Sequence, residues 1–177
     1  MRLKLASAVA AVALATRSFG LTEVRLQGGR GLLMDVETAR LILRRPRLVD
    51  VPALFEFLGD VKAMQYTHAD VSLRECRRRV AVHEWRRRHD GYAPWTIIAK
   101  SDGRAIGWGG LYDDPFDPSW GVEVAYYFHP LAWGQGYASE MVAACMSVAD
   151  HALRAGGPGL RTSEESGVAA RAGEGRL

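Results

Sequence analysis

The sequence predicts an α+β fold of three layers, in which helices flank a mostly antiparallel sheet. A strand-like segment at residues 40–44 precedes two helical segments, at 50–58 and 72–89. An Asp-Gly pair then separates two further strand-like segments within 95–112. Residues 122–153 place a strand, a glycine-rich turn and an amphipathic helix in direct succession. A chain of 177 residues is long enough to bury a sizeable core in one domain.

Both helices of the first half are predicted from their end signals as well as from their periodicity. Asp50 has the residue type of an N-cap, and Pro52 follows in the first turn, where its missing N–H leaves no hydrogen bond unmade. Ser72 and Glu75 have the spacing of a capping box ahead of the second helix, and Asp90-Gly91 ends it. The residues expected on the buried faces are Leu54, Phe55 and Leu58 in the first helix and Leu73, Cys76 and Val80 in the second.

The next segment is expected to form a β-hairpin. Trp95–Lys100 and Arg104–Tyr112 are strand-like, and Ser101-Asp102-Gly103 between them is a strong turn signal. Three glycines of the second strand indicate a bulge, a close approach to a ligand or simple packing: Gly107, Gly109 and Gly110. The large aromatic residues of the strands are expected in the core, with the lining of a ligand pocket as the alternative: Trp95, Trp108, Trp120, Tyr126 and Tyr127.

Residues 122–153 contain the strand, glycine-rich turn and helix that are typical of a phosphate-binding site. A strand with alternating Val124, Tyr126 and Phe128 ends at Pro130, and helical periodicity begins at Ala138. Between them, Trp133-Gly134-Gln135-Gly136-Tyr137-Ala138 contains two glycines that allow φ > 0 and a close backbone approach. Free amides at the start of a helix, reinforced by the helix dipole, suit a pyrophosphate, although a plain tight turn would also explain the glycines.

These residues resemble the GCN5-related N-acetyltransferase (GNAT) family, and within it the branch of ribosomal-protein N-terminal acetyltransferases. The acetyl-CoA loop of the family reads Gln/Arg-x-x-Gly-x-Gly/Ala, and this branch commonly has Trp at the position of Trp133. The preceding strand resembles that of the family in Glu123-Val124-Ala125-Tyr126 and in the closing His129-Pro130. Thr38–Arg45 resembles the first strand of the family, so the resemblance covers about residues 36–153.

The resemblance implies an acetyl-CoA-dependent N-acetyltransferase with a GNAT-like mixed, mostly antiparallel sheet. Acetyl-CoA is the expected cosubstrate, no metal is expected, and the acceptor is a primary amine on a protein N-terminus or a small molecule. Glu123 is implied as the general base, with an ion pair at the sheet surface as the alternative. The residues implied to bind the cofactor are Val124, Tyr126 and Phe128 along the pantetheine arm, and Trp133, Gly134, Gln135, Gly136, Tyr137 and Ala138 around the pyrophosphate.

Composition divides the chain into three parts. Residues 1–33 begin with basic residues and the apolar run Leu5–Ala15, which resembles a signal peptide or precedes a true start at Met34. That run is too short to span a bilayer, so no membrane is expected. Residues 34–153 are the expected acetyltransferase domain, placed in the cytoplasm with export as the alternative. Residues 154–177 are rich in Gly, Ala, Arg, Ser and Glu, which indicates disorder and a family domain that lacks its C-terminal strands.

The net charge of +3 at pH 7 does not come from the expected domain, since residues 34–153 carry a slight acidic excess. Glu75, Glu84 and Asp90 lie among the arginines of the second helix, so a solvated helix face is favoured over a nucleic-acid site. The arginines concerned are Arg74, Arg77, Arg78, Arg79, Arg86, Arg87 and Arg88.

The cysteines and histidines indicate no further chemistry. Cys76 and Cys145 fall on apolar helix faces and are expected in the core, because they form neither a disulfide framework nor a metal cluster. No ligand role is expected of the histidines, which lack metal-binding spacing: His68, His83, His89, His129 and His151.

Three functions follow from the sequence. The first is acetyl transfer to an amine. The second is a catalytically impaired CoA-binding fragment of such an enzyme, which would bind the cofactor without releasing its thiol. The third is a basic-helix binding module, which would bind nucleic acid without binding CoA. The sequence indicates no particular amine and no oligomeric state.

Overall fold

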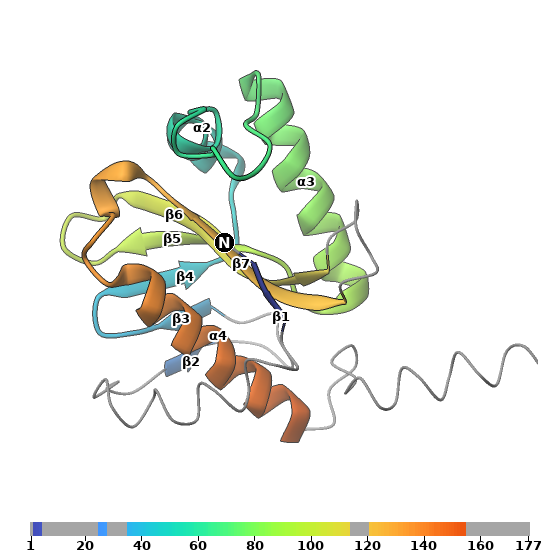
Figure 1. The fold of residues 1–177 in the computed structure, drawn as a ribbon. Helices are drawn as coiled ribbons and strands as arrows, with labels where there is room; N and C mark the ends of the chain where they lie inside the picture. The colour runs from blue at the N-terminus through green and yellow to red at the C-terminus, as the bar shows by residue number, and fades with distance from the viewer. Residues whose placement is uncertain (1, 5–24, 28–34, 114–120, 155–177) are drawn as a thin grey trace, which may run out of the picture.

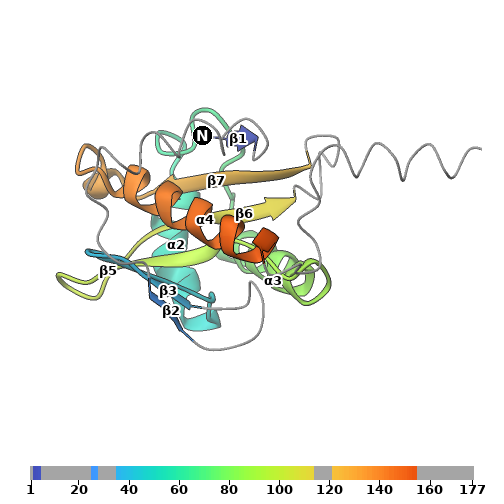
Figure 2. The same ribbon diagram turned by 90° about the horizontal axis from the view of Figure 1, so that it is seen from below.

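In the computed structural model of the protein, one antiparallel sheet lies between two helical layers (Figure 1). Helices α2 (Val51–Leu58) and α3 (Leu73–Asp90) lie on one face of the sheet. Helix α4 (Tyr137–Arg154) crosses the other face, as the view from below shows (Figure 2). The three-layer α+β prediction is confirmed. The residues that the structure describes are 2–4, 25–27, 35–113 and 121–154.

Within these residues the sheet has seven strands in the order β1-β7-β6-β5-β4-β3-β2, and all neighbours pair antiparallel. The strands are β1 (Arg2–Lys4), β2 (Arg25–Gln27), β3 (Asp35–Glu37), β4 (Leu41–Arg44), β5 (Trp95–Ala99), β6 (Ala105–Asp113) and β7 (Val122–Phe128). Strands β5 and β6 form the expected hairpin, and Gly103 in its turn has a φ of 71°. The four strands predicted from sequence patterns are confirmed.

The glycines of β6 allow close packing within the sheet. A Cβ on Gly109 would lie 2.6 Å from the carbonyl oxygen of Ala125, and a Cβ on Gly110 would lie 2.6 Å from the ring of Trp95. The pairing of β5 with β6 also shifts by one residue beside Gly107. Packing and a bulge therefore both account for glycine here.

Asp50 precedes α2 without capping it. Its backbone is helical, and its side chain makes no cap hydrogen bond. The carboxylate instead accepts hydrogen bonds from the Arg44 guanidinium at 2.7 and 2.8 Å and from the N–H of Arg47 at 2.7 Å. Asp50 therefore stands at the predicted N-cap position, but its side chain does not cap the helix because an ion pair with Arg44 of β4 occupies the carboxylate. Phe57 is fully buried in the core, whereas Phe55, expected there, is only partly buried.

Helix α3 has the predicted ends but a different buried face. Ser72 accepts a hydrogen bond from the N–H of Glu75 at 3.2 Å, and Gly91 ends the helix with a φ of 83°. Leu73, expected to be buried, is 49 % exposed because it lies in the first turn, beyond the edge of the core. The buried residues of the helix are Cys76, Val80, His83 and Arg87.

Arg87 is an exception among the arginines of α3, because it is fully buried. Its guanidinium donates to the carbonyl oxygens of Ala93 and Pro94 at 2.8 and 2.6 Å and pairs with Glu84 at 2.6 Å. These bonds tie the end of α3 to the segment that enters β5. The predicted solvated face is therefore wrong for this residue.

Two apolar clusters join the layers. One lies between the sheet and α4 and includes Leu41, Val124 and Met141, while the other lies under α2 and α3 and includes Phe57 and Trp108. The two cysteines are free and fully buried, one in each cluster, as predicted: Cys145 and Cys76. Burial raises the pKa of each thiol to about 12.

Two short strands of the sheet come from the N-terminal segment. Residues 2–4 pair with β7, where Leu3 lies opposite Val124, and residues 25–27 pair with β3. The apolar signal-like run and the tail expected to be disordered lie outside the described residues, apart from the end of α4. In the part of the chain that is described, no helix is long and apolar enough to cross a membrane.

Candidate active site

Strand β7 directs its two faces to different parts of the molecule. Val124 and Phe128 pack into the cluster under α4. Glu123 and Tyr127 alternate with them and therefore lie on the face that carries α2 and α3. Pro130 then begins the short 3₁₀ turn Pro130–Ala132, which leads into the glycine-rich turn. The strand thus brings the chain to the point where α4 begins.

The turn from Trp133 to Ala138 depends on its two glycines. Gly134 and Gly136 have φ values of 72° and 76°, which other residues adopt only with strain. A Cβ on Gly134 would meet nothing within 4 Å. Helix α4 begins directly afterwards at Tyr137, and its first N–H groups have no acceptor within the helix. A pyrophosphate can therefore approach the backbone, and the helix dipole favours its negative charge.

A buried carboxylate anchors this turn to the start of β4. Glu140 accepts hydrogen bonds from the Thr38 hydroxyl at 2.6 Å and from the N–H and Nε of Arg40 at 2.9 and 2.6 Å. Nη1 of Arg40 donates to the carbonyl oxygen of Gln135 at 2.8 Å, and the guanidinium lies 4.6 Å from the ring centroid of Tyr137. Burial alone would raise the pKa of Glu140, but the hydrogen bonds from Thr38 and Arg40 outweigh it and lower the pKa.

A cavity of about 1170 Å³ runs from this turn to α3. Val124 and Gln135 are not part of its lining. Val124 is fully buried in the core, and the Gln135 amide turns back to donate to the carbonyl oxygen of Leu131 at 2.7 Å. The other residues predicted to bind the cofactor all line the cavity: Tyr126, Phe128, Trp133, Gly134, Gly136, Tyr137 and Ala138.

The outer edge of β7, on the side away from β6, meets the cavity beyond β1. Strand β1 pairs with β7 only as far as Ala125. The N–H of His129 donates to Ile106 of β6 at 2.9 Å, so by alternation the backbone groups of Tyr126 and Phe128 point to the outer edge. One of these backbone groups, the carbonyl oxygen of Phe128, already accepts a hydrogen bond from the indole N–H of Trp133 at 2.9 Å.

Glu123, the expected base, is fully buried on β7. It lies opposite Tyr112 of β6 in the register of the sheet, and on the same face as Tyr127. Both tyrosines line the cavity, whereas Glu123 does not. A proton that moves from the cavity to this carboxylate therefore needs an intermediary, such as a water molecule.

The wall formed by β6 and α3 is aromatic and carries a buried histidine. The ring of His83 lies 5.0 Å from that of Trp108 and 5.3 Å from that of Tyr112. Burial, together with nearby arginines of α3, lowers the pKa of His83 to about 4, so the imidazole is neutral at pH 7. Of the aromatic residues considered for a pocket, Trp108, Tyr126 and Tyr127 line the cavity, Trp95 is fully buried, and Trp120 lies outside the described residues.

This buried imidazole predicts a loss of stability in acid. Because its pKa is lower in the folded than in the unfolded chain, the unfolded chain binds the extra proton, and stability falls as the pH drops from about 6.5 towards 4. Between pH 7 and pH 5 the free energy of unfolding should fall by about 2 kcal/mol through this group alone. Urea unfolding of the wild type and of His83→Gln at both pH values measures the difference; an equal pH dependence in the two proteins would contradict the prediction.

Residues 40–165 match the family model described as an acetyltransferase (GNAT) domain. The chain belongs to the GNAT acetyltransferase family. The match continues beyond Leu153, where the resemblance of the motifs ended. Among solved structures, the fold is similar to that of the acetyltransferase (GNAT family) from Bacillus anthracis, with 19 % sequence identity and a TM-score of 0.56. That similarity covers 68 % of this chain and 69 % of the other, and it supports the α+β fold.

As a GNAT acetyltransferase, the chain is an acyltransferase that depends on acetyl-CoA. The structure adds residues to the site that sequence patterns did not indicate. Arg40 and Glu140 hold the turn, and His83 completes the aromatic wall. One sequence signal could have indicated Glu140. It is an acidic residue in the first turn of α4, where its charge would repel the anion proposed to bind there unless the carboxylate had another partner.

Replacing Glu140 by Gln is expected to loosen the turn of this GNAT acetyltransferase. The variant loses the carboxylate charge that strengthens the hydrogen bonds accepted from Thr38 and Arg40, which should lower the free energy of unfolding by about 1.5–3 kcal/mol. It should also raise the Kd for acetyl-CoA, because the turn is no longer held in one geometry. Urea unfolding and calorimetry measure the two effects. Glu56→Gln on the exposed side of α2 is the control, and equal behaviour of the two variants would refute the anchor.

Proposed function

We propose that the chain transfers the acetyl group of acetyl-CoA to a primary amine, on a protein N-terminus or a small molecule. The observation that supports this is one continuous cavity, which is lined by the glycine-rich turn, the outer edge of β7 and the aromatic wall. In the proposal the turn amides bind the pyrophosphate, the backbone of Tyr126 and Phe128 binds the pantetheine arm, and the amine enters from the aromatic wall. The cytoplasm, where acetyl-CoA is available, is the proposed location.

In the proposed reaction the lone pair of the neutral amine attacks the carbonyl carbon of the thioester. The carbon–sulfur bond then breaks, and CoA leaves as a thiolate that takes up a proton. An ammonium has no lone pair, so a base must first accept its proton. We assign that role to Glu123, acting through a water molecule because its carboxylate lies behind the cavity wall.

A second candidate function is CoA binding with little or no turnover. Two observations favour it: Glu123 does not line the cavity, and β1 lies beside Val124, where part of the pantetheine arm was expected. The narrower proposal of a ribosomal-protein N-terminal acetyltransferase rests on Trp133 and the strand motif Glu123–Tyr126.

The test is thiol release from acetyl-CoA by the full chain, measured with a panel of small amines and of peptides with free N-termini. Release that depends on the amine supports acetyl transfer, and the preferred amine identifies the acceptor class. Saturable CoA binding without such release would favour the second candidate. Nucleic-acid binding without CoA binding would instead favour a basic-helix module.

A further inference from the structure

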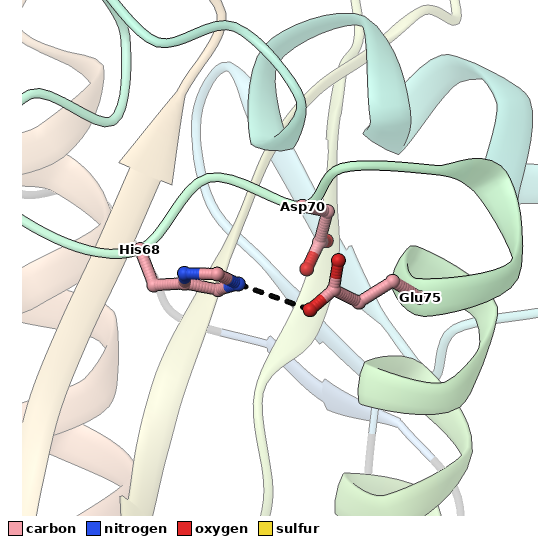
Figure 3. A group of neighbouring side chains, drawn as sticks. All are labelled: His68, Asp70 and Glu75. Atoms are coloured by element: carbon pink, nitrogen blue, oxygen red, sulfur yellow. Dashed lines mark hydrogen bonds and ion pairs between the residues drawn. The ribbon is translucent and has the colours of Figure 1, made fainter.

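Three side chains with metal-binding atoms meet beside the start of α3 (Figure 3). His68 and Asp70 lie in the loop before α3, and Glu75 lies in the first turn of that helix. One potential ligand atom of each residue lies within 4.8 Å of those of the other two. All three residues line the cavity, yet neither the glycine-rich turn nor Glu123 involves them.

Asp70 is held through one of its oxygens, and Glu75 through both. Arg79 binds Oδ1 of Asp70 through Nε at 3.0 Å and Nη2 at 2.8 Å. The N–H of Val71 donates to Oε2 of Glu75 at 2.7 Å, while Oε1 lies 3.0 Å from Nε2 of His68. Arg79 also donates to the carbonyl oxygen of His68 at 3.1 Å, so it steadies the loop that carries two of the three residues. Outer hydrogen bonds of this kind orient metal ligands.

The other oxygen of Asp70 is buried and has no strong hydrogen-bond donor in the described part of the chain. Asp70 is 2 % exposed, and its Oδ2 is buried without a hydrogen-bond partner among the described residues, although the weak S–H donor of Cys76 lies near the carboxylate. Burial raises the pKa of Asp70, and the charge of Glu75 adds to that effect, while Arg79 opposes it. Two carboxylates this close are stabilised by a cation between them.

We propose that His68, Asp70 and Glu75 bind a divalent transition-metal ion such as Zn²⁺. One imidazole nitrogen and two carboxylate oxygens are a donor set that zinc uses. Ligands of a tetrahedral zinc ion lie about 3.4 Å apart, which follows from bond lengths of about 2.1 Å. The His68–Glu75 separation of 3.0 Å is close to this value, and an oxygen of Asp70 within 4.8 Å of both atoms completes the set by moving towards them.

The ion takes the place of the contact between His68 and Glu75, and it neutralises the carboxylate charge that Arg79 leaves uncompensated. The ammonium group of an acceptor amine fits this site less well than a metal ion does. It is attached to the rest of its molecule, and Oδ2 of Asp70 is too buried for such a group to reach. The bound ion joins the loop to the first turn of α3. It therefore fixes the cavity wall on which Tyr66 and Thr67 also lie.

Calorimetric titration of the full chain with ZnCl₂ alone tests the site. We expect saturable binding of one ion, weakened roughly tenfold or more in His68→Ala and in Glu75→Gln. Glu75→Gln keeps an oxygen for the N–H of Val71, so the loop should remain folded. His151→Ala removes an exposed imidazole on α4 and is the control, which should bind zinc as the wild type does. Hydrogen exchange should show zinc-dependent protection of residues 67–76.

Three outcomes would overturn the proposal. The first is no saturable binding by the folded chain. The second is binding that the two variants leave intact, or that His151→Ala weakens equally. The third is saturable binding of 1,4-diaminobutane that depends on His68 and Glu75 in the absence of zinc binding, which would make the cluster an amine site. Circular dichroism of each variant ensures that a loss of binding does not come from unfolding.

Discussion

Gly136→Glu should abolish acetyl-CoA binding, with a rise in Kd of roughly 100-fold or more, equivalent to about 2.7 kcal/mol. The new carboxylate would stand in the turn proposed for the pyrophosphate and repel it. A Cβ at this position would lie 3.6 Å from Nη2 of Arg40, so the added charge would also compete for the guanidinium that holds the turn. Calorimetric titration with acetyl-CoA measures the effect.

Gly103→Glu is the matched control for this variant. Gly103 has a φ of 71°, close to the 76° of Gly136, so both substitutions introduce similar backbone strain. A Cβ on Gly103 would meet nothing within 4 Å, and the residue lies in the β5–β6 turn, outside the cavity. Both variants should lose a similar amount of stability, but only Gly136→Glu should lose the cofactor. Equal affinities in the two would show that the turn does not bind acetyl-CoA.

Glu123→Gln should reduce kcat by roughly 10²–10⁴, the usual contribution of a general base. The amide keeps the shape of the side chain but cannot take a proton from the amine. The Kd for acetyl-CoA should stay within about twofold of the wild type, because the carboxylate does not line the cavity. Stopped-flow or steady-state thiol release gives kcat, and calorimetry gives Kd.

Two comparisons separate this catalytic role from a structural one. Raising the pH supplies more neutral amine, so the rate of Glu123→Gln should recover with pH more steeply than that of the wild type. Glu140→Gln also removes a buried carboxylate, yet it should change cofactor binding and stability without this pH response. A kcat of Glu123→Gln that is close to that of the wild type, or a loss explained by its unfolded fraction, would assign Glu123 a structural role.

The sequence predicted the elements that are defined by local signals. Alternation and turn residues located β5, β6 and β7, and the glycines located the start of α4 within a residue. Ser72 and Gly91 marked the ends of α3 because cap chemistry depends on neighbours in the chain. Most of the residues that these signals indicated for the cofactor line one cavity in the structure.

Contacts between distant segments were not predictable in this way. Arginine is usually solvated, but Arg87 is buried and donates hydrogen bonds to carbonyl oxygens of the segment before β5. Aspartate is a common N-cap residue, but the carboxylate of Asp50 accepts hydrogen bonds from the Arg44 guanidinium instead. Glu140 accepts a hydrogen bond from Thr38, which is 102 residues away in the sequence, and no local sequence pattern predicts such a contact.

The cluster of His68, Asp70 and Glu75 was missed for a different reason. Metal-binding spacing is a recognisable signal for histidines and cysteines, but two of the three side chains here are carboxylates. Carboxylates are common on exposed loops, so their spacing alone gives little information. What distinguishes Asp70 is its burial, which depends on the packing of α2 and α3 around the loop.

The most direct test of the central claim is hydrogen exchange of the full chain with and without acetyl-CoA. We expect slower exchange of the amides from Gly134 to Ala138, which are proposed to bind the pyrophosphate. Exchange should also slow at Tyr126 and Phe128, whose backbone groups point to the outer edge of β7. Saturable binding that leaves these amides unchanged, or that protects another surface instead, would contradict the assignment of the cofactor site.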